Sequence, residues 1–151
     1  MGAISIQSTR ALVIPLAMLG ILVHLTPVRA GMYGSNVVEL TSENFKALVI
    51  DSSSTWLVKF YAPWCGHCQQ SAPAFSKAAK KLEGIAKLGV VNGDDQKDLS
   101  SKYGIRGFPS IKIFKGEGKK ERRPSDYTGE RTASAFAKHV KYVMPSYIAR
   151  I

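Results

Sequence analysis

The sequence predicts an α/β fold in which a central mixed β-sheet is flanked by helices on both faces. Three observations predict it. Strand-like and helix-like segments alternate through the first part of the domain, and a hairpin pattern followed by a helix closes it. Residues 56–62 form a nearly continuous apolar run, which is typical of a central strand buried on both faces. With 151 residues, the chain has the size of one domain.

Hydrophobic periodicity and capping residues place the elements in order. Strands are expected at 37–40, 56–62, 86–92, 110–114 and 122–127, and helices at 41–49, 65–82, 97–102 and 132–143. Thr41 and Thr132 are the expected N-caps of the first and last helices. Gly104 and Pro145 are expected to end the third and last helices, and Pro73 to kink the second.

Residues 1–30 have the pattern of a secretory signal peptide, so the folded domain is expected at 31–151. A positive charge precedes an apolar run over residues 11–25, and the small residue Ala30 suggests cleavage before Gly31. This run is shorter than the ~20 apolar residues that span a bilayer. An uncleaved membrane anchor is the alternative.

The formal net charge of +10 raises the question of an anionic partner. The basic residues are spread along the chain without aromatic interleaving, so no nucleic acid is expected. Their densest cluster, residues 119–123, lies between glycines and a proline and is typical of a solvated turn. A weak docking patch for acidic clients is the alternative interpretation of this cluster.

The chain has two cysteines, Cys65 and Cys68, at the predicted junction of a strand and a helix. A C-x-x-C motif in this position indicates a thiol–disulfide redox site. Positions i and i+3 share a helix face, ~5–6 Å apart, within reach of a disulfide. The helix N-terminus favours a thiolate, so Cys65 is predicted to be the nucleophile and Cys68 the resolving thiol.

Gly66 and His67 separate the two cysteines. An imidazole at His67 would stabilise the Cys65 thiolate and with it the reduced form, which makes the disulfide a better oxidant. Three other interpretations remain open. They are a structural disulfide closing a short loop, a pair of inert buried thiols, and half of a zinc site completed from His24, His67 and His139.

Two sequence blocks resemble the protein disulfide isomerase family. Residues 60–68 read Phe-Tyr-Ala-Pro-Trp-Cys-Gly-His-Cys, and residues 103–112 read Tyr-Gly-Ile-Arg-Gly-Phe-Pro-Ser-Ile-Lys. Tyr-Thr-Gly-Glu-Arg at 127–131 also resembles the family's approach to its last helix. The resemblance covers about residues 37–143 and implies a single catalytic a-type domain with a thioredoxin-like fold.

The resemblance also implies roles for further residues. Pro109 would be the family's cis-proline, placing the Phe108 backbone beside Cys65, where a client strand could pair with it. Arg106 would tune the inner cysteine, unless it is only a surface charge. Trp64 would form part of the wall of the site and contact clients.

Lys59 departs from the family, most of whose members carry a buried acid there that accepts the inner cysteine's proton. A lysine can accept one only if burial lowers its pKa and removes its charge. Otherwise Lys59 would hold the Cys68 thiolate by charge, or would extend its ammonium to solvent and contribute only packing. We expect it to be a poor substitute, so that Lys59→Glu speeds release of the mixed disulfide.

The sequence therefore predicts a thiol–disulfide oxidoreductase and isomerase that forms, reduces and rearranges disulfides in client proteins. The endoplasmic reticulum lumen or the extracellular space is the expected location. Glutathione or an oxidase is the expected redox partner, and we expect a monomer with no cofactor, no metal and no membrane span after signal cleavage. The alternative function is a client-binding chaperone or secreted binding module. No second C-x-x-C and no Lys-Asp-Glu-Leu-type tail is present, which fits a single-domain protein or a fragment.

Overall fold

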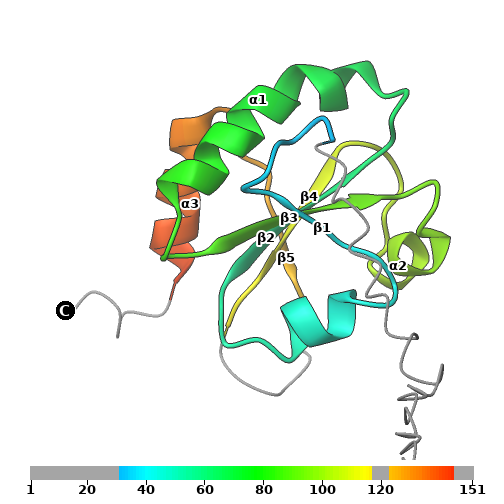
Figure 1. Ribbon diagram of the computed structural model, residues 1–151, viewed down its shortest axis with the longest axis horizontal. Coiled ribbons are helices and arrows are strands. Elements are labelled where there is room, and N and C mark those ends of the chain that lie inside the picture. Colours follow the sequence, from blue (N-terminus) through cyan, green and yellow to red (C-terminus); the bar gives the residue numbers. More distant parts are fainter. Residues whose placement is uncertain (1–30, 117–122, 145–151) are drawn as a thin grey trace, which may run out of the picture.

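The computed structural model describes residues 31–116 and 123–144. The predicted signal peptide, most of the basic cluster at 119–123, and Pro145 lie outside these ranges. Within them the chain folds into a sheet of five strands covered by helices (Figure 1), which confirms the predicted fold class. The elements are β1 (Val38–Glu39), the π-helical turn η2 (Lys46–Ile50), β2 (Trp56–Tyr61), α1 (Gly66–Lys81), β3 (Lys87–Asn92), α2 (Lys97–Lys102), β4 (Ser110–Phe114), β5 (Ser125–Asp126) and α3 (Ala133–Val143).

The sheet is mixed, with the strand order β1-β3-β2-β4-β5. β1, β3 and β2 are parallel, whereas β4 runs antiparallel to both β2 and β5. β2 occupies the centre, where Lys59 pairs with Val90 on one side and with Ile111 on the other. The carboxyl end of this central strand leads directly into the C-x-x-C stretch, so the sheet fixes the position of the cysteines.

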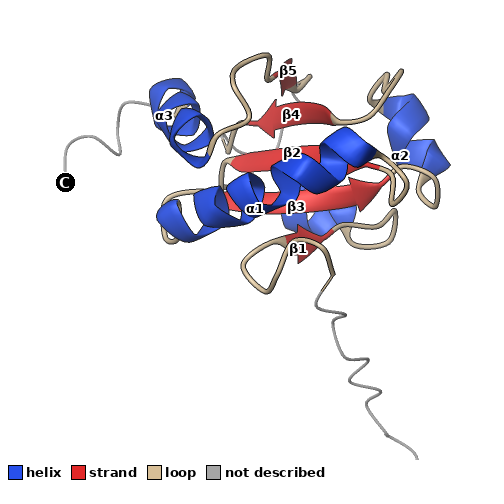
Figure 2. Ribbon diagram, turned by 90° about the horizontal axis from the view of Figure 1, so that it is seen from above, coloured by secondary structure: helices blue, strands red, loops and turns tan. Residues whose placement is uncertain are grey.

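Apolar layers form on both faces of the sheet, and β2 contributes to each of them. Leu57 packs into the layer beneath α1 and α3, where the rings of Phe75 and Phe136 lie 5.5 Å apart. Val58 points into the opposite layer, which η2 and α2 cover. Figure 2 shows α1 lying across β2 and β3. No helix among the described residues combines the length and the apolar character required to cross a membrane.

The first predicted helix is the element that the sequence placed least well. Thr41 does not cap it through its side chain; instead its backbone N–H donates to Asn44 Oδ1 at 2.9 Å. The asparagine side chain thus satisfies a backbone N–H ahead of the helical residues, as the N3 residue of a capping box does, and residues 42–44 form turns. The helix begins at Phe45, whose N–H bonds to the Thr41 carbonyl, and continues as η2, where the N–H of Asp51 bonds to the carbonyl of Lys46, five residues back.

The other helix ends agree with their predicted capping residues. The Thr132 hydroxyl accepts a hydrogen bond from the Ala135 N–H at 3.2 Å, as an N-cap does. Gly104 follows α2 with a φ of 63°, a left-handed conformation that favours glycine. α1 continues through Pro73, and the predicted kink there stays a prediction.

Candidate active site

Cys65 is the N-cap of α1, in the position that the C-x-x-C motif predicted. Its backbone is extended (φ −78°, ψ 109°), and its carbonyl accepts from the Gln69 N–H at 3.1 Å. Its sulfur accepts a hydrogen bond from the backbone N–H of Cys68 at 3.2 Å. The sulfur therefore occupies the place that an oxygen takes in an ordinary N-cap, where the donors of the first turn favour negative charge.

The two cysteines form a disulfide, with their Cα atoms 5.2 Å apart. Cys68 is fully buried, whereas Cys65 retains an exposed fraction of 6%. A reactant arriving from solvent therefore meets Cys65 first. In the described part of the chain, no three histidine, cysteine or acidic residues form a metal-binding group. His139, considered for a zinc site, packs edge-on against Tyr127 with ring centroids 5.0 Å apart.

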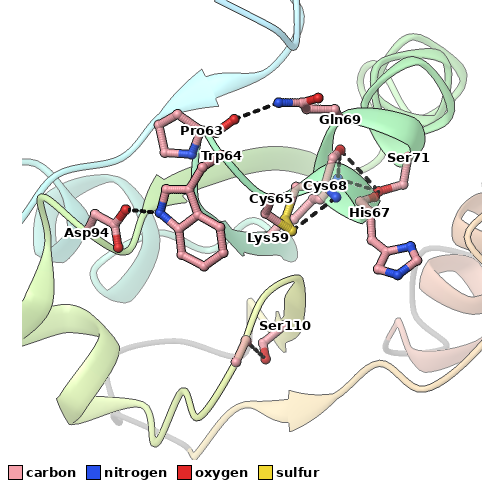
Figure 3. Close-up of a disulfide and its surroundings, with 11 residues drawn as sticks. Lys59, Pro63, Trp64, Cys65, His67, Cys68, Gln69, Ser71, Asp94 and Ser110 are labelled. Atoms are coloured by element: carbon pink, nitrogen blue, oxygen red, sulfur yellow. Dashed lines mark hydrogen bonds between the residues drawn. A yellow bond between two sulfur atoms is a disulfide. The ribbon is translucent and has the colours of Figure 1, made fainter.

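Two aromatic side chains form a wall beside the disulfide. Trp64 is 71% exposed, and its Nε1 donates to Asp94 Oδ2 at 2.6 Å (Figure 3). Its ring meets Phe108 edge to face, with centroids 6.2 Å apart. Phe108 in turn packs against the small apolar cluster that contains both cysteines. This arrangement leaves apolar surface next to the reachable sulfur.

Three further predicted site residues lie around this wall. The Phe108–Pro109 peptide bond is cis, as the resemblance implied. Arg106 is exposed in the segment between α2 and β4, and no hydrogen bond or ion pair joins it to either cysteine in the described chain. His67 is also exposed, and in Figure 3 its imidazole projects away from the sulfur atoms. The tuning roles of Arg106 and His67 stay predictions.

Lys59 lies behind the disulfide and is fully buried. Its Nζ donates to the carbonyl of Cys68 at 3.2 Å and to Ser71 Oγ at 2.8 Å. Ser71 Oγ lies 2.7 Å from the His67 carbonyl, to which it donates its only hydrogen, so it accepts from Lys59. The alternative in which Lys59 extends its ammonium to solvent is therefore wrong, because α1 offers buried acceptors within reach.

Burial and, to a smaller extent, the positive charge of Arg131 together lower the pKa of Lys59 to about 8. No salt bridge among the described residues involves Lys59. A buried ammonium without a counter-ion is costly, which is why the neutral amine gains population. Near neutral pH this lysine therefore exchanges between a proton donor and a proton acceptor, beside the backbone of the inner cysteine.

Sequence reasoning missed three residues of this site: Ser71, Tyr33 and Asp94. Ser71 was within reach of prediction, since it lies three residues after Cys68 and shares its helix face. Asp94 follows β3 as Trp64 follows β2, and parallel strands end at the same edge of a sheet. Tyr33 lies outside every predicted element, so no pattern pointed to it.

Comparisons with known proteins agree with this geometry. The thioredoxin family model matches residues 36–142. The chain is 52% identical to the protein disulfide-isomerase A6 homolog of Drosophila melanogaster over 101 residues, which are 67% of this chain and 23% of that protein. It is 50% identical to protein disulfide-isomerase A6 of Homo sapiens over 107 residues, 70% of this chain and 24% of that protein. The chain thus spans about a quarter of the length of these curated relatives.

One solved structure matches this chain over most of the length of both proteins. It is the first thioredoxin domain of mouse protein disulfide-isomerase A4, with 36% sequence identity and a TM-score of 0.62. The match covers 72% of this chain and 76% of that domain. The resemblance to protein disulfide isomerases is therefore confirmed at the level of one thioredoxin domain.

Proposed function

Because this chain belongs to the thioredoxin family and matches the thioredoxin domains of protein disulfide isomerases, we propose that it is a thiol–disulfide oxidoreductase and isomerase. Its substrates are disulfides and dithiols of client proteins. The observation that carries the proposal is the position of Cys65, whose sulfur is the reachable end of a disulfide and accepts an N–H at a helix N-terminus. A thiolate formed there is stabilised by the same donors.

Reduction of a client disulfide takes two exchange steps. The Cys65 thiolate attacks one client sulfur, the client S–S bond breaks, and the second client sulfur leaves as a thiolate. Cys68 then gives up its proton and attacks the Cys65 sulfur, which restores the Cys65–Cys68 disulfide and releases the first client sulfur. The reverse sequence oxidises a client dithiol, and attack followed by release within one client rearranges its disulfides.

Clients meet the site at the wall formed by Trp64 and Phe108. The exposed indole supplies apolar area, and its hydrogen bond to Asp94 holds it in place. The Phe108 backbone next to the cis-proline Pro109 is the segment that an extended client pairs with. Arg106 and His67 stand at the exposed rim and act on the charge of the thiolates.

Lys59 accepts the proton that Cys68 loses in the second step. Its Nζ is hydrogen-bonded to the Cys68 carbonyl. Its pKa of about 8 leaves only a minor fraction of the amine neutral at pH 7. A carboxylate at this position would be ionised at neutral pH and ready to accept a proton. Compared with the wild type, Lys59→Glu should therefore release the mixed disulfide faster near pH 7. Lys59→Met has no amine to accept the proton, so above pH 8 it should release the mixed disulfide more slowly than the wild type.

We further propose that the protein works in the secretory pathway, in the endoplasmic reticulum lumen or after secretion. The signal-peptide pattern of residues 1–30 supports this location, as does a redox disulfide, which persists in oxidising compartments. Glutathione or an oxidase would then return the cysteines to their starting state. The domain would comprise residues 31–151.

Reduction of insulin, followed by turbidity, tests the function with two matched variants. The wild-type protein should turn over, Cys65→Ser should be inactive, and Cys68→Ser should accumulate a mixed disulfide with the client. Equal turnover by wild type and Cys65→Ser would refute the proposal. A wild-type protein that suppresses client aggregation without turnover would instead support the binding-module alternative, with the exposed Trp64 as its contact surface.

A further inference from the structure

Tyr33 belongs to the segment before β1, yet it is buried beside the redox site. Its ring meets Tyr61 of β2 and Phe75 of α1 edge to face, with centroids 5.1 and 6.0 Å away. Its backbone carbonyl accepts a hydrogen bond from Ser76 Oγ at 2.6 Å. The side chain is only 4% exposed. The core thus holds this ring in one place between the central strand and α1.

The place that the Tyr33 ring occupies is one wall around the amine of Lys59. The Nζ lies 4.9 Å from the Tyr33 ring centroid and 5.5 Å from that of Phe75. Its two hydrogen-bond acceptors, the Cys68 carbonyl and Ser71 Oγ, lie on α1. The amine is therefore enclosed by two acceptors and two aromatic rings. Phe75 comes from within α1, so Tyr33 is the one ring supplied by a segment outside the sheet and α1.

The Tyr33 hydroxyl contributes no polar contact to this position. It is buried and makes no hydrogen bond to the described residues. Burial, with a smaller contribution from Tyr61, raises the pKa of Tyr33, so the phenol stays neutral at working pH. The side chain therefore gives Lys59 a ring face and no counter-charge. A phenylalanine would provide the same enclosure.

None of the groups named around Lys59 carries a negative charge, so the aromatic enclosure is the main determinant of its pKa. Cys68 and Ser71 face the amine from α1, Tyr61 lies beside Tyr33 on β2, and Arg131 acts from the segment before α3. Arg131 carries the same charge as the lysine. Whether water reaches the amine therefore decides how readily Lys59 holds a proton.

We propose that Tyr33 is a positioning residue of the redox site, whose ring closes the space around Lys59 to water and so keeps the amine ready to take the Cys68 proton. This inference rests on the proposed redox function. In the second exchange step the S–H bond of Cys68 breaks, its proton binds the neutral amine, and its electron pair forms the new bond to the Cys65 sulfur. The client sulfur leaves with the electrons of the mixed disulfide. The ammonium returns its proton to water before the next cycle.

Tyr33→Ala and Tyr33→Phe form a matched pair that separates the ring from the hydroxyl. An NMR titration of the Lys59 side chain in the oxidised protein gives its pKa without any catalytic turnover. In Tyr33→Phe this pKa should stay at the wild-type value. In Tyr33→Ala water can enter, so the pKa should move toward 10.5, the ordinary value of lysine. Tyr33→Leu fills only part of the space that the ring fills and should shift the pKa in the same direction but by less, which provides a second variant if Tyr33→Ala does not fold.

Stopped-flow release of a client from its Cys65 mixed disulfide gives the kinetic test. The pH at which release reaches half its maximum should rise in Tyr33→Ala and not in Tyr33→Phe. In the Lys59→Met background, Tyr33→Ala should leave the profile unchanged. An unshifted pKa in both Tyr33→Ala and Tyr33→Leu, or an equal shift in Tyr33→Phe, would overturn the role of the ring. Absence of insulin turnover by the wild type would overturn the proposed function instead, and the NMR titration would still test the enclosure.

Discussion

The free energy of unfolding of the oxidised protein should rise between about pH 7 and about pH 9.5, and Lys59→Met should remove that rise. The pKa of Lys59 is about 8 in the folded chain against an ordinary value of 10.5, first because of burial and then because of Arg131. Below pH 8 both the folded and the unfolded chain carry the ammonium, so its destabilising effect is fully present. Above pH 8 the folded chain loses the proton while the unfolded chain keeps it, and stability therefore increases with pH.

The size of this effect follows from the two pKa values. Their difference, 10.5 − 8, is about 2.5. It corresponds to ~3 kcal/mol between the pH extremes, at 1.36 kcal/mol for each unit. About 2 kcal/mol of this should be recovered between pH 7 and pH 9.5, before the unfolded lysine begins to titrate. Oxidised cysteines do not titrate, and tyrosines that ionise near pH 10 in the unfolded chain affect both variants alike.

Urea denaturation at several pH values, followed by circular dichroism, measures the effect as a difference between variants. The free energy of unfolding of the wild type minus that of Lys59→Met should change by ~2 kcal/mol over this pH range. The hydrogen bonds lost in Lys59→Met add a constant to this difference and do not alter its change with pH. Lys138→Met, which removes an exposed lysine of α3, is the matched control and should parallel the wild type. Parallel plots of unfolding free energy against pH for wild type and Lys59→Met would refute the claim that a buried lysine with a lowered pKa titrates in this range.

Three further predictions concern the exposed side of the site. Brief alkylation of the reduced protein near pH 6 should label Cys65, since its sulfur is the reachable one; mass-spectrometric mapping of the adduct mainly to Cys68 would reverse the two roles. His67→Pro should make the disulfide harder to reduce, because it removes the imidazole and one N–H at the helix N-terminus. Equilibration with glutathione measures the reduction potential, in which a shift of ~30 mV equals ~1.4 kcal/mol. A more oxidising Cys65–Cys68 couple in the variant would contradict this prediction. Gly93→Ala should displace Phe108, because a Cβ there would overlap its ring, and so raise the KM for a peptide client with little change in thiol reactivity; an unchanged KM would remove Phe108 from the client surface.

The sequence predicted the central strand, α1 and the cysteine pair well because several local signals agree there. An apolar run, a helical periodicity and a C-x-x-C motif all specify the same strand–helix junction. α2 and β4 were predicted to the residue, since Gly104 ends one and alternation marks the other. The segment at 41–49 is helical only from Phe45 on, and its start is held by a hydrogen bond from the Thr41 N–H to Asn44 in place of the expected Thr41 side-chain cap.

The inner half of the site depends on contacts that local patterns do not encode. The sequence shows a lysine within an apolar strand, but it does not show whether that amine reaches solvent. The answer depends on Ser71, one turn along α1, and on the Cys68 carbonyl, which together accept its hydrogen bonds. It also depends on Tyr33, which lies in no predicted element and is far from Lys59 along the chain. Tertiary packing alone places these groups around one amine.

The proposed role of Lys59 as the acceptor of the Cys68 proton makes stability and the rate of the second exchange step share a pH midpoint. The proton that Lys59 loses as the pH passes about 8 relieves the folded chain of a buried charge, and in the proposed mechanism the same loss creates the acceptor for Cys68. The release rate of a mixed disulfide should therefore rise through the pH at which the stability difference between wild type and Lys59→Met begins to change. Arg131→Ala should move both midpoints upward together, since it removes the positive charge that disfavours the ammonium. Movement of the stability midpoint alone would show that a group other than Lys59 takes the Cys68 proton.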